Sequence, residues 1–217
     1  ARKIFWSMNG SLIHNENKLL KISNALKAYN ETQDKEADAN QSDYSANDWI
    51  NKAVNRPRVR YIEGASMNSI WVNRSLGIDP ATGNELFADR NGGIVSDWSS
   101  ANYVIGGCTD PKVEGTFGTN FTWKGLSLNM TFRYRIGGQM YNQTLVDKVQ
   151  DIDPRYNADK RAFEQRWQKP GDQVRFAAFS EDSQGINIGY RTKPTSRFVE
   201  DYNYLELATL NVAYEFG

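Results

Sequence analysis

The stretch Leu126 to Ile136, LSLNMTFRYRI, decides the fold that this sequence predicts. Its apolar residues occupy every second position: Leu126, Leu128, Met130, Phe132, Tyr134 and Ile136. The intervening positions are polar: Ser127, Asn129, Thr131, Arg133 and Arg135. An unbroken period of two is that of a β-strand with one apolar and one polar face. Its length fits the ~9–11 residues of a tilted membrane-spanning strand better than the ~5–6 of an ordinary strand.

A second strand precedes this one, since apolar and polar residues also alternate from Phe117 to Trp123. Lys124-Gly125 between the two strands supplies a two-residue turn in which glycine takes a positive φ. The pair is therefore predicted to be an antiparallel hairpin with strands at 113–123 and 126–136. Similar alternation predicts further strands at 3–13 and 198–216.

The composition limits the class of protein. The 217 residues carry 26 Lys plus Arg and 26 Asp plus Glu, a balance that disfavours nucleic acid as a partner. Mean hydropathy is −0.67, and no run approaches the ~20 apolar residues of a membrane helix. Only alternate residues of a β-barrel strand face lipid, so a polar composition remains compatible with a barrel. Cys108 is the only cysteine, which excludes an intrachain disulfide and a thiolate zinc site.

Two long segments lack strand periodicity, roughly 24–55 and 137–196, and a helix is conceivable at 45–54. Outer-membrane barrels have short periplasmic turns and long external loops. On that rule the Lys124-Gly125 turn is periplasmic and both segments are extracellular. Trp123, Tyr214 and Phe216 then fall at the periplasmic ends of their strands on the lipid side, as an aromatic girdle. The strands within 56–105 cannot be placed from the sequence.

Loop aromatics are the candidate ligand contacts, because aromatic rings stack on sugars and pack on partner proteins. The candidates are Trp98, Tyr103, Trp167, Phe176 and Tyr190, with most loop aromatics expected to pack in loop cores. Arg133 and Arg135 alternate with the lipid-facing set and should face the lumen. There they line a solute path or pair with carboxylates such as Glu215.

Other polar residues give weaker signals of chemistry. The carboxylates of 137–196 include Asp147, Asp151, Asp153, Glu164 and Asp172, but no motif fixes a pair at glycosidase spacing. His14 has no accompanying metal ligands. The segment Asp79 to Glu85 does not match a calcium loop, and Asp79-Pro80 with Gly83 is better explained as a turn. The RWQKPGD segment is read as a loop-stabilising turn with Trp167 packed beneath it. No enzyme, metal site or cofactor is predicted.

Five strings in this order resemble one family. They are YIEGASMNSIWV (Tyr61–Val72), GIDPATGNELFAD (Gly77–Asp89), GGCTDPKVEGTFGTNFTWKGLSLNMTFRYRIGGQMYN (Gly106–Asn142), RWQKPGD (Arg166–Asp172) and RFVEDYNYLELATLNVAYEF (Arg197–Phe216). Together they are similar to the C-terminal part of the barrel of SusC/RagA-like TonB-dependent transporters from the outer membrane of Bacteroidetes-type bacteria. No single string is specific, whereas the ordered set is.

The resemblance implies an all-β fold, a section of an antiparallel barrel of about 22 strands. It also implies a plug domain, a TonB box and terminal strands that this sequence does not include. No signal peptide opens the chain, so the start of the exported protein is expected elsewhere. The implied partners are a SusD-like surface lipoprotein, TonB through the plug, the remaining barrel strands and lipid.

The implied function is import of glycans or oligosaccharides, with peptide import as the alternative within the family. Two other classes remain as alternatives. A cell-surface β-sandwich that binds or adheres would cover the apolar face of the Leu126–Ile136 strand with protein. A loop-borne hydrolase would lose turnover on changing two of the loop carboxylates.

Overall fold

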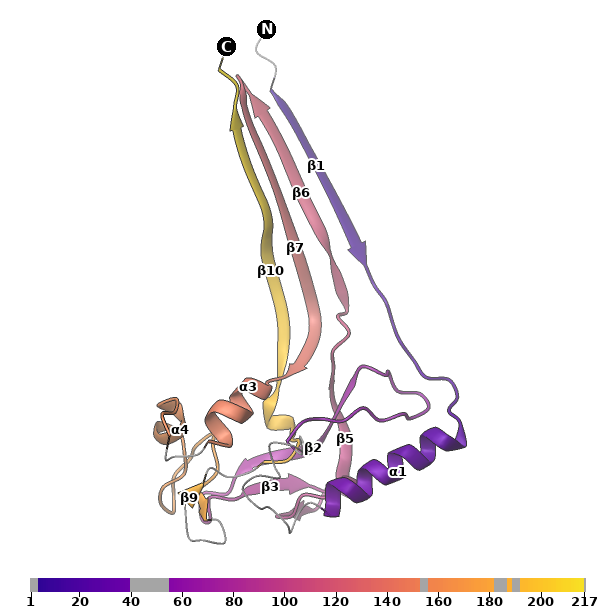
Figure 1. Ribbon diagram of the computed structural model, residues 1–217, viewed down its shortest axis with the longest axis vertical. Helices are drawn as coiled ribbons and strands as arrows, with labels where there is room; N and C mark the ends of the chain where they lie inside the picture. Colours follow the sequence, from indigo (N-terminus) through magenta and orange to yellow (C-terminus); the bar gives the residue numbers. More distant parts are fainter. Residues whose placement is uncertain (1–3, 40–54, 153–155, 182–186, 189–191, 217) are drawn as a thin grey trace. The chain divides into compact units, whose positions relative to one another are not determined.

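The computed structural model describes residues 4–39, 55–152, 156–181, 187–188 and 192–216 (Figure 1). The chain divides into two compact units. Unit 1 comprises Ala1–Asn17, Cys108–Met140 and Asp201–Gly217, and unit 2 comprises Lys18–Gly107 and Tyr141–Glu200. Each unit is described separately below.

Unit 1 is a sheet of four long strands in the order β1-β6-β7-β10 (Figure 1). Their bounds are β1 Phe5–Ile13, β6 Val113–Trp123, β7 Leu126–Tyr141 and β10 Val199–Tyr214. The β1–β6 and β6–β7 pairs are antiparallel. β7 continues beyond the expected Ile136 to Tyr141. The described strands form antiparallel sheets and do not close into a barrel.

A tight turn joins β6 to β7. Trp123 pairs with Leu126, and the two residues between them have positive φ, 51° at Lys124 and 84° at Gly125. Positive φ at both central positions defines a type I′ turn, whose twist matches that of the flanking strands. The end of β10 packs on this turn, because the Glu215 amide donates to the Gly125 carbonyl at 2.9 Å.

The first prediction concerns this turn. A Cβ at Gly125 would lie 2.8 Å from the Glu215 carbonyl oxygen, at a φ of +84° that L-residues avoid. Gly125→Ala should therefore lower the free energy of unfolding by about 1–2 kcal/mol. The measurement is urea unfolding of the purified full-length protein. The matched control is Lys124→Gly, which relaxes the neighbouring residue and should be neutral or stabilising; equal losses for both variants would contradict the turn geometry.

The register across β1, β6 and β7 separates the side chains of this sheet into two faces. One face carries the rows Trp6–Phe121–Leu128, Met8–Thr119–Met130, Gly10–Phe117–Phe132 and Leu12–Gly115–Tyr134. The other carries the rows Ser7–Asn120–Asn129, Asn9–Gly118–Thr131 and Ser11–Thr116–Arg133. The sheet is thus amphipathic, with a mainly apolar face opposite a polar face.

None of the described side chains of unit 1 covers the apolar face. Trp6, Met8 and Leu12 are 65%, 67% and 69% exposed, and no hydrophobic side chain among the described residues of this unit is buried. The apolar side chains contact one another along the sheet instead, as in the stacked Phe117–Phe132 pair at 4.9 Å between ring centroids. The face therefore requires an apolar environment from outside the unit.

Unit 2 contains the strands that the sequence did not place. They form a sheet in the order β4-β3-β2-β5, with β2 Ser69–Ile78, β3 Glu85–Ala88, β4 Ile94–Val95 and β5 Tyr103–Cys108. A separate short pair consists of β8 (Ser180–Glu181) and β9 (Asn187–Ile188). The four-stranded sheet lies between the two expected long segments, and the β8–β9 pair lies within the second of them, 137–196.

Helices make up much of the rest of unit 2. They are α1 (Asn24–Ala39), η1 (Ser100–Asn102), α3 (Gln143–Leu145), η2 (Val146–Gln150), α4 (Arg161–Glu164) and η3 (Ser196–Phe198). α1 occupies the first half of the segment expected to be an external excursion, and the helix suggested at 45–54 lies outside the described residues. Among the described residues, no helix is both long and apolar enough to cross a membrane.

Two hydrophobic cores hold unit 2 together. One gathers Leu145, Val146, Val149, Ile152, Ala162, Phe176 and Phe198. The other gathers Ala37, Ala65, Trp71, Phe87, Trp98 and Tyr103. Burial of these side chains gives the segments a packed interior, so they form a folded unit rather than separate connections.

Candidate functional site

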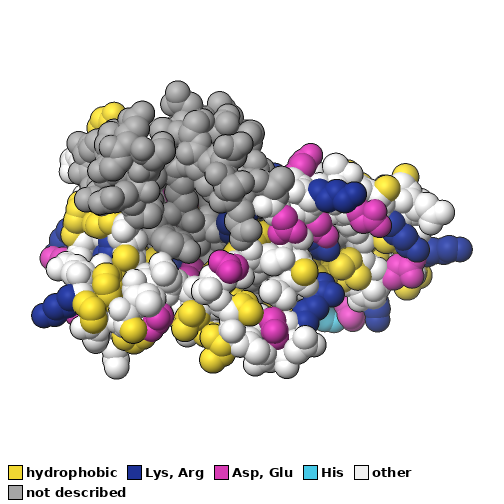
Figure 2. Space-filling model, turned by 90° about the horizontal axis from the view of Figure 1, so that it is seen from below, with side chains coloured by type: hydrophobic (Ala, Val, Ile, Leu, Met, Phe, Trp, Pro, Cys, Tyr) yellow, Lys and Arg dark blue, Asp and Glu magenta, His cyan; other side chains and the backbone are white. Residues whose placement is uncertain are grey.

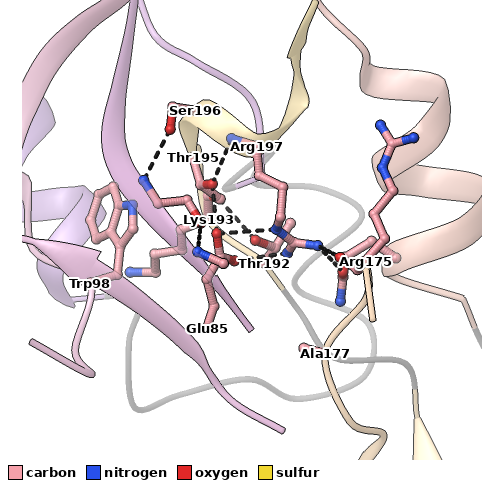
Figure 3. Close-up of polar contacts among 12 residues, drawn as sticks. Glu85, Trp98, Arg175, Ala177, Thr192, Lys193, Thr195, Ser196 and Arg197 are labelled. Carbon is pink, nitrogen blue, oxygen red and sulfur yellow. Dashed lines mark hydrogen bonds and ion pairs between the residues drawn. The ribbon is translucent and has the colours of Figure 1, made fainter. Parts of the chain in front are cut away.

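Unit 2 contains a buried ion pair (Figure 3). Glu85, at the start of β3, is 0% exposed. Arg197 of η3 donates to both of its carboxylate oxygens, at 2.8 Å from Nη2 and 3.2 Å from Nε. Thr195 donates its hydroxyl to the same carboxylate at 2.7 Å. This bidentate hydrogen bonding is the strongest geometry of an Arg–carboxylate ion pair.

Arg197 also connects β3 to two other segments. Its Nη1 donates to the Gln150 side chain at 3.1 Å and to the Arg175 carbonyl. Thr195 caps η3 by accepting the Arg197 amide at 3.2 Å, which fixes the backbone that carries the guanidinium. The Glu85–Arg197 pair therefore joins four segments that are far apart in the sequence.

Arg166 is a second buried hub. It is 2% exposed and donates four hydrogen bonds to backbone carbonyls. The acceptors are Ala162 at 2.7 Å, Ala177 at 2.9 Å, Val149 at 2.6 Å and Gln150 at 2.8 Å. Burial lowers the pKa of Arg166 to about 10, so the side chain stays charged at neutral pH. The guanidinium thus satisfies carbonyls that the core would otherwise leave unpaired.

Two further buried groups have shifted pKa values. Burial raises the pKa of Asp151 to about 8, against the opposing hydrogen bonds from the Thr192 amide at 2.9 Å and Asn55 at 3.2 Å. Burial lowers the pKa of Lys193 to about 8. The Lys193 ammonium donates to the Ala37 carbonyl and lies 4.7 Å from the centre of the Trp98 ring. Both side chains therefore form their contacts in the interior of unit 2.

The loop carboxylates have structural contacts in the structure. Asp151 is buried, and Asp172 closes a turn by accepting the Gln168 and Lys169 amides at 3.1 and 3.0 Å. Glu164 forms an ion pair with Lys160 at 3.7 Å. Asp147 accepts from Asn55 at 3.0 Å, and Asp153 lies outside the described residues. None of these contacts sets up a pair of carboxyls flanking a bond to be cleaved.

The other polar candidates are also explained by local structure. Asp79 closes the turn before β3, accepting from the Ala81 amide at 3.0 Å and the Thr82 hydroxyl at 2.7 Å. These bonds lower the pKa of its carboxyl. His14 Nδ1 lies 2.6 Å from the Lys112 carbonyl. Within the described part of the chain, no group of three or more potential metal ligands comes together.

Three of the five candidate aromatics are core residues. Trp98 and Tyr103 are 5% and 6% exposed and meet edge to face at 5.2 Å, and Phe176 is 0% exposed. These three rings are packed in the cores of unit 2, as expected for most loop aromatics. Tyr190 lies outside the described residues.

Trp167 is half-buried and fixes a turn, as the RWQKPGD pattern indicates. Its ring packs so closely on Gly83 that a Cβ there would lie 2.6 Å away. Its Nε1 donates to the Pro80 carbonyl at 2.9 Å, and the Gly171 amide donates to the same carbonyl at 2.8 Å. Two turns distant in sequence are thereby joined at Pro80.

Arg133 and Arg135 lie on the polar face of unit 1. Arg133 lies 3.8 Å from Glu206 of β10, a carboxylate other than the Glu215 given as an example. Both members of the pair are more than half exposed, at 57% and 55% of the side chain, so its contribution to stability is small. Arg135 donates to the Thr109 carbonyl, and its guanidinium lies 5.5 Å from the centre of the Tyr202 ring.

The structure also reveals two surface clefts in unit 2 that sequence reasoning missed. The larger, here called the Pro80 cleft, has a volume of about 570 Å³ and is lined by Gly77, Ile78, Pro80, Glu164, Gln165, Gln173, Val174 and Arg175. The smaller has about 340 Å³, and its lining includes Asp147, Asp151 and Asp159. In the sequence, the turns at Pro80 and Pro170 are the features that could have indicated the larger cleft. Residues beside these two turns line it.

Charges of both signs are interspersed over the face seen in Figure 2, outside the grey area. No large area of a single sign stands out there. This distribution agrees with the equal numbers of acidic and basic residues in the sequence. It does not resemble the basic surface that binds nucleic acid.

Comparison with known proteins gives structural matches only. No family model and no curated protein matches the sequence. Among solved structures, the RagAB peptide importer in its open-open state matches 70% of this chain at a TM-score of 0.55 and 22% identity. The RagAB peptide transporter matches 71% at 0.55 and 22%, and the closed-closed state of the importer matches 70% at 0.54 and 23%. This chain covers only 16–17% of those chains, and the likeness concerns the fold.

Proposed function

We propose that this chain is a section of an outer-membrane transporter for organic nutrients, of the TonB-dependent class. The observation that carries the proposal is the amphipathic sheet of unit 1, whose apolar face no described side chain of that unit covers. In a bilayer, lipid would cover this face, while the polar face would line an aqueous lumen. The fold shared with RagAB importer chains supports the same class.

The complete barrel would include about 22 strands, a plug that couples to TonB, and further strands beside β1 and β10. Strand edges cannot stay unpaired in lipid, so β1 and β10 need such neighbours. Unit 2 would form external loops, beneath a SusD-like surface lipoprotein. The β6–β7 turn would be periplasmic, beside the exposed aromatics Trp123, Tyr214 and Phe216, which are 39%, 55% and 88% exposed.

The transported substrate would be an oligosaccharide or a peptide. Loop aromatics that stack on sugar rings would support a glycan as substrate. Trp98, Tyr103 and Phe176 are buried, so this support for a glycan is weaker. The RagAB structures are those of a peptide importer. Arg133 and Arg135, on the polar face, would lie along the solute path. A β-sandwich adhesin would need a second layer over the apolar face, and the described residues of unit 1 do not supply one.

The second prediction tests the membrane assignment. Met130 and Thr131 are adjacent on β7 but belong to opposite faces of the sheet. Single cysteines at each position, Met130→Cys and Thr131→Cys, are introduced with Cys108→Ser to remove the native thiol. In native outer membranes, an aqueous charged thiol reagent should label the Thr131→Cys variant and a lipid-soluble reagent the Met130→Cys variant. Equal labelling of both by the aqueous reagent would overturn the assignment.

A further inference from the structure

Helix α1 (Asn24–Ala39) lacks the apolar stripe by which a helix usually attaches to a protein. Among its described side chains only Ala37 is buried. The half-buried ones recur at helical spacing and are mostly polar: Leu26, Asn30, Gln33, Asp34 and Asp38. Asn30, for example, exchanges two hydrogen bonds with the Tyr61 backbone, at 2.7 and 3.1 Å. Most helical stability in proteins comes from packing of an apolar face, so polar contacts must hold α1 in place.

The charges of α1 oppose its own helix. Its acidic residues occupy positions from the middle to the end: Glu31, Asp34, Glu36 and Asp38. The last turn contains no basic residue. The C-terminal end of a helix dipole is partly negative, so acidic side chains there destabilise an isolated helix. At the other end, Ser23 accepts the Leu26 amide at 3.3 Å as an N-cap. The first turn is therefore stabilised locally, whereas the second half depends on contacts outside the helix.

Two arginines of the preceding part of unit 2 provide contacts of this kind. Arg60 forms a bidentate ion pair with Asp34, in which Nη2 lies 3.0 Å from Oδ2. The two side chains are 10% and 27% exposed, so solvent screens this pair only in part. Arg58 donates to Gln33 at 2.8 Å and to Glu36 at 3.0 Å. The acidic inner face of α1 thus meets two guanidinium groups.

Two further contacts hold the last turn of α1. The Lys193 ammonium donates to the Ala37 carbonyl, which is one of the terminal carbonyls that no amide of the helix can reach. It also supplies the positive charge that this helix end lacks. Asp38 accepts from the Ser100 amide at 2.8 Å and from the Ser100 hydroxyl at 2.6 Å. The three cations Arg58, Arg60 and Lys193 are here called the basic site.

Aromatic rings hold two cations of the basic site independently of α1. The Arg60 guanidinium lies 4.9 Å from the centre of the Tyr103 ring and 5.7 Å from that of Trp71. The Lys193 ammonium lies 4.7 Å from the centre of the Trp98 ring (Figure 3). All three rings belong to one hydrophobic core of unit 2. Core packing and cation–π contacts therefore keep these cations in position if α1 leaves.

We propose that α1 is a strap that opens from the basic site on its own and unfolds as it opens, while the rest of unit 2 stays folded. Elements with few buried apolar contacts open at the lowest free energy, and α1 is such an element. The chain before it is held by backbone bonds of Leu19 with Ala65 at 2.9 Å and with Gly64 at 2.7 Å, so the strap would pivot there. Opening would expose Arg60 and Lys193 as a basic surface backed by aromatic rings. It would occur whether or not the protein is a transporter.

The third prediction uses amide hydrogen exchange of the purified full-length protein, detected by mass spectrometry. In the wild type, the amides of 33–38 should exchange at least about tenfold faster than the Phe176 amide, each relative to its intrinsic rate. The Phe176 amide is the reference because it bonds to the Gln165 carbonyl at 3.0 Å beside a hydrophobic core. Asp34→Asn removes the counter-charge of Arg60 and should speed exchange of 33–38 by about a further tenfold. Exchange at Phe176 should not change.

Glu31→Gln is the matched control, because it removes the same charge from an exposed position of the same helix. It should change exchange of 33–38 by no more than about threefold, the size of an exposed pair with the i+4 neighbour Lys35. Equal protection of 33–38 and Phe176 in the wild type would mean that α1 opens only with the whole unit, and would overturn the proposal. Equal acceleration by Glu31→Gln and Asp34→Asn, or acceleration at Phe176 as large as in α1, would also overturn it.

Discussion

Arg166→Met is expected to destabilise unit 2 by about 3–5 kcal/mol, because four buried backbone carbonyls lose their donor together. Each unpaired buried acceptor costs about 1–3 kcal/mol, and relief of the buried charge offsets part of the sum. Methionine approximates the length of the lost side chain and can keep contact with Phe179, whose ring centre lies 4.3 Å from the guanidinium. The loss is therefore one of hydrogen bonding rather than of packing.

The measurement is amide hydrogen exchange of the native protein, read at the Phe176 and Trp167 amides. The Trp167 amide donates to the Phe176 carbonyl and the Phe176 amide donates to the Gln165 carbonyl, at the β-bridge between Arg166 and Phe176. Their opening free energies should fall by the stated amount. Arg161→Met is the matched control, since Arg161 is exposed and bonds only locally to Asp159. It should leave the opening free energies at Phe176 and Trp167 close to those of the wild type. Similar losses in both variants would show that Arg166 is not a hub.

The strands of unit 1 were predictable because their signal is local. β6 and β7 carry mainly apolar side chains on one face and polar side chains on the other, so alternation is visible within a few residues of Leu126 or Phe117. The extension of β7 to Tyr141 was not visible, since Gly137-Gly138-Gln139 interrupts the apolar alternation. There the strand is held by partners on β10: Asn203 accepts the Gly137 amide at 2.6 Å and Asp201 accepts from Gln139 at 3.3 Å.

The interior of unit 2 could not be predicted in the same way. In β2, the consecutive residues Ile70, Trp71, Val72 and Asn73 are all buried, so both faces are covered and alternation disappears. Glu85 and Arg197 are 112 residues apart in sequence, and nothing local marks them as partners. Residue type alone does not separate ligand contacts from core residues, because a loop aromatic is as suited to a core as to a ligand.

The second large effect is expected at the Glu85–Arg197 pair. Glu85→Ala should destabilise unit 2 by about 3–5 kcal/mol, because it leaves a guanidinium that is only 9% exposed without its counter-charge. It also removes the acceptor of the Thr195 hydroxyl. Glu85→Gln keeps a hydrogen-bond acceptor and loses only the charge, so its loss should be smaller. The opening free energy of unit 2 amides, by hydrogen exchange, is again the measurement.

A double-mutant cycle separates the pair from its surroundings. Arg197→Met alone should also be costly, since it leaves the Glu85 carboxylate buried and uncompensated. The double variant leaves neither charge, so its loss should be well below the sum of the single losses, by more than about 1 kcal/mol. Additive losses would mean that the two residues act independently. Strong coupling would instead show that the Glu85–Arg197 pair holds β3 and η3 together inside unit 2.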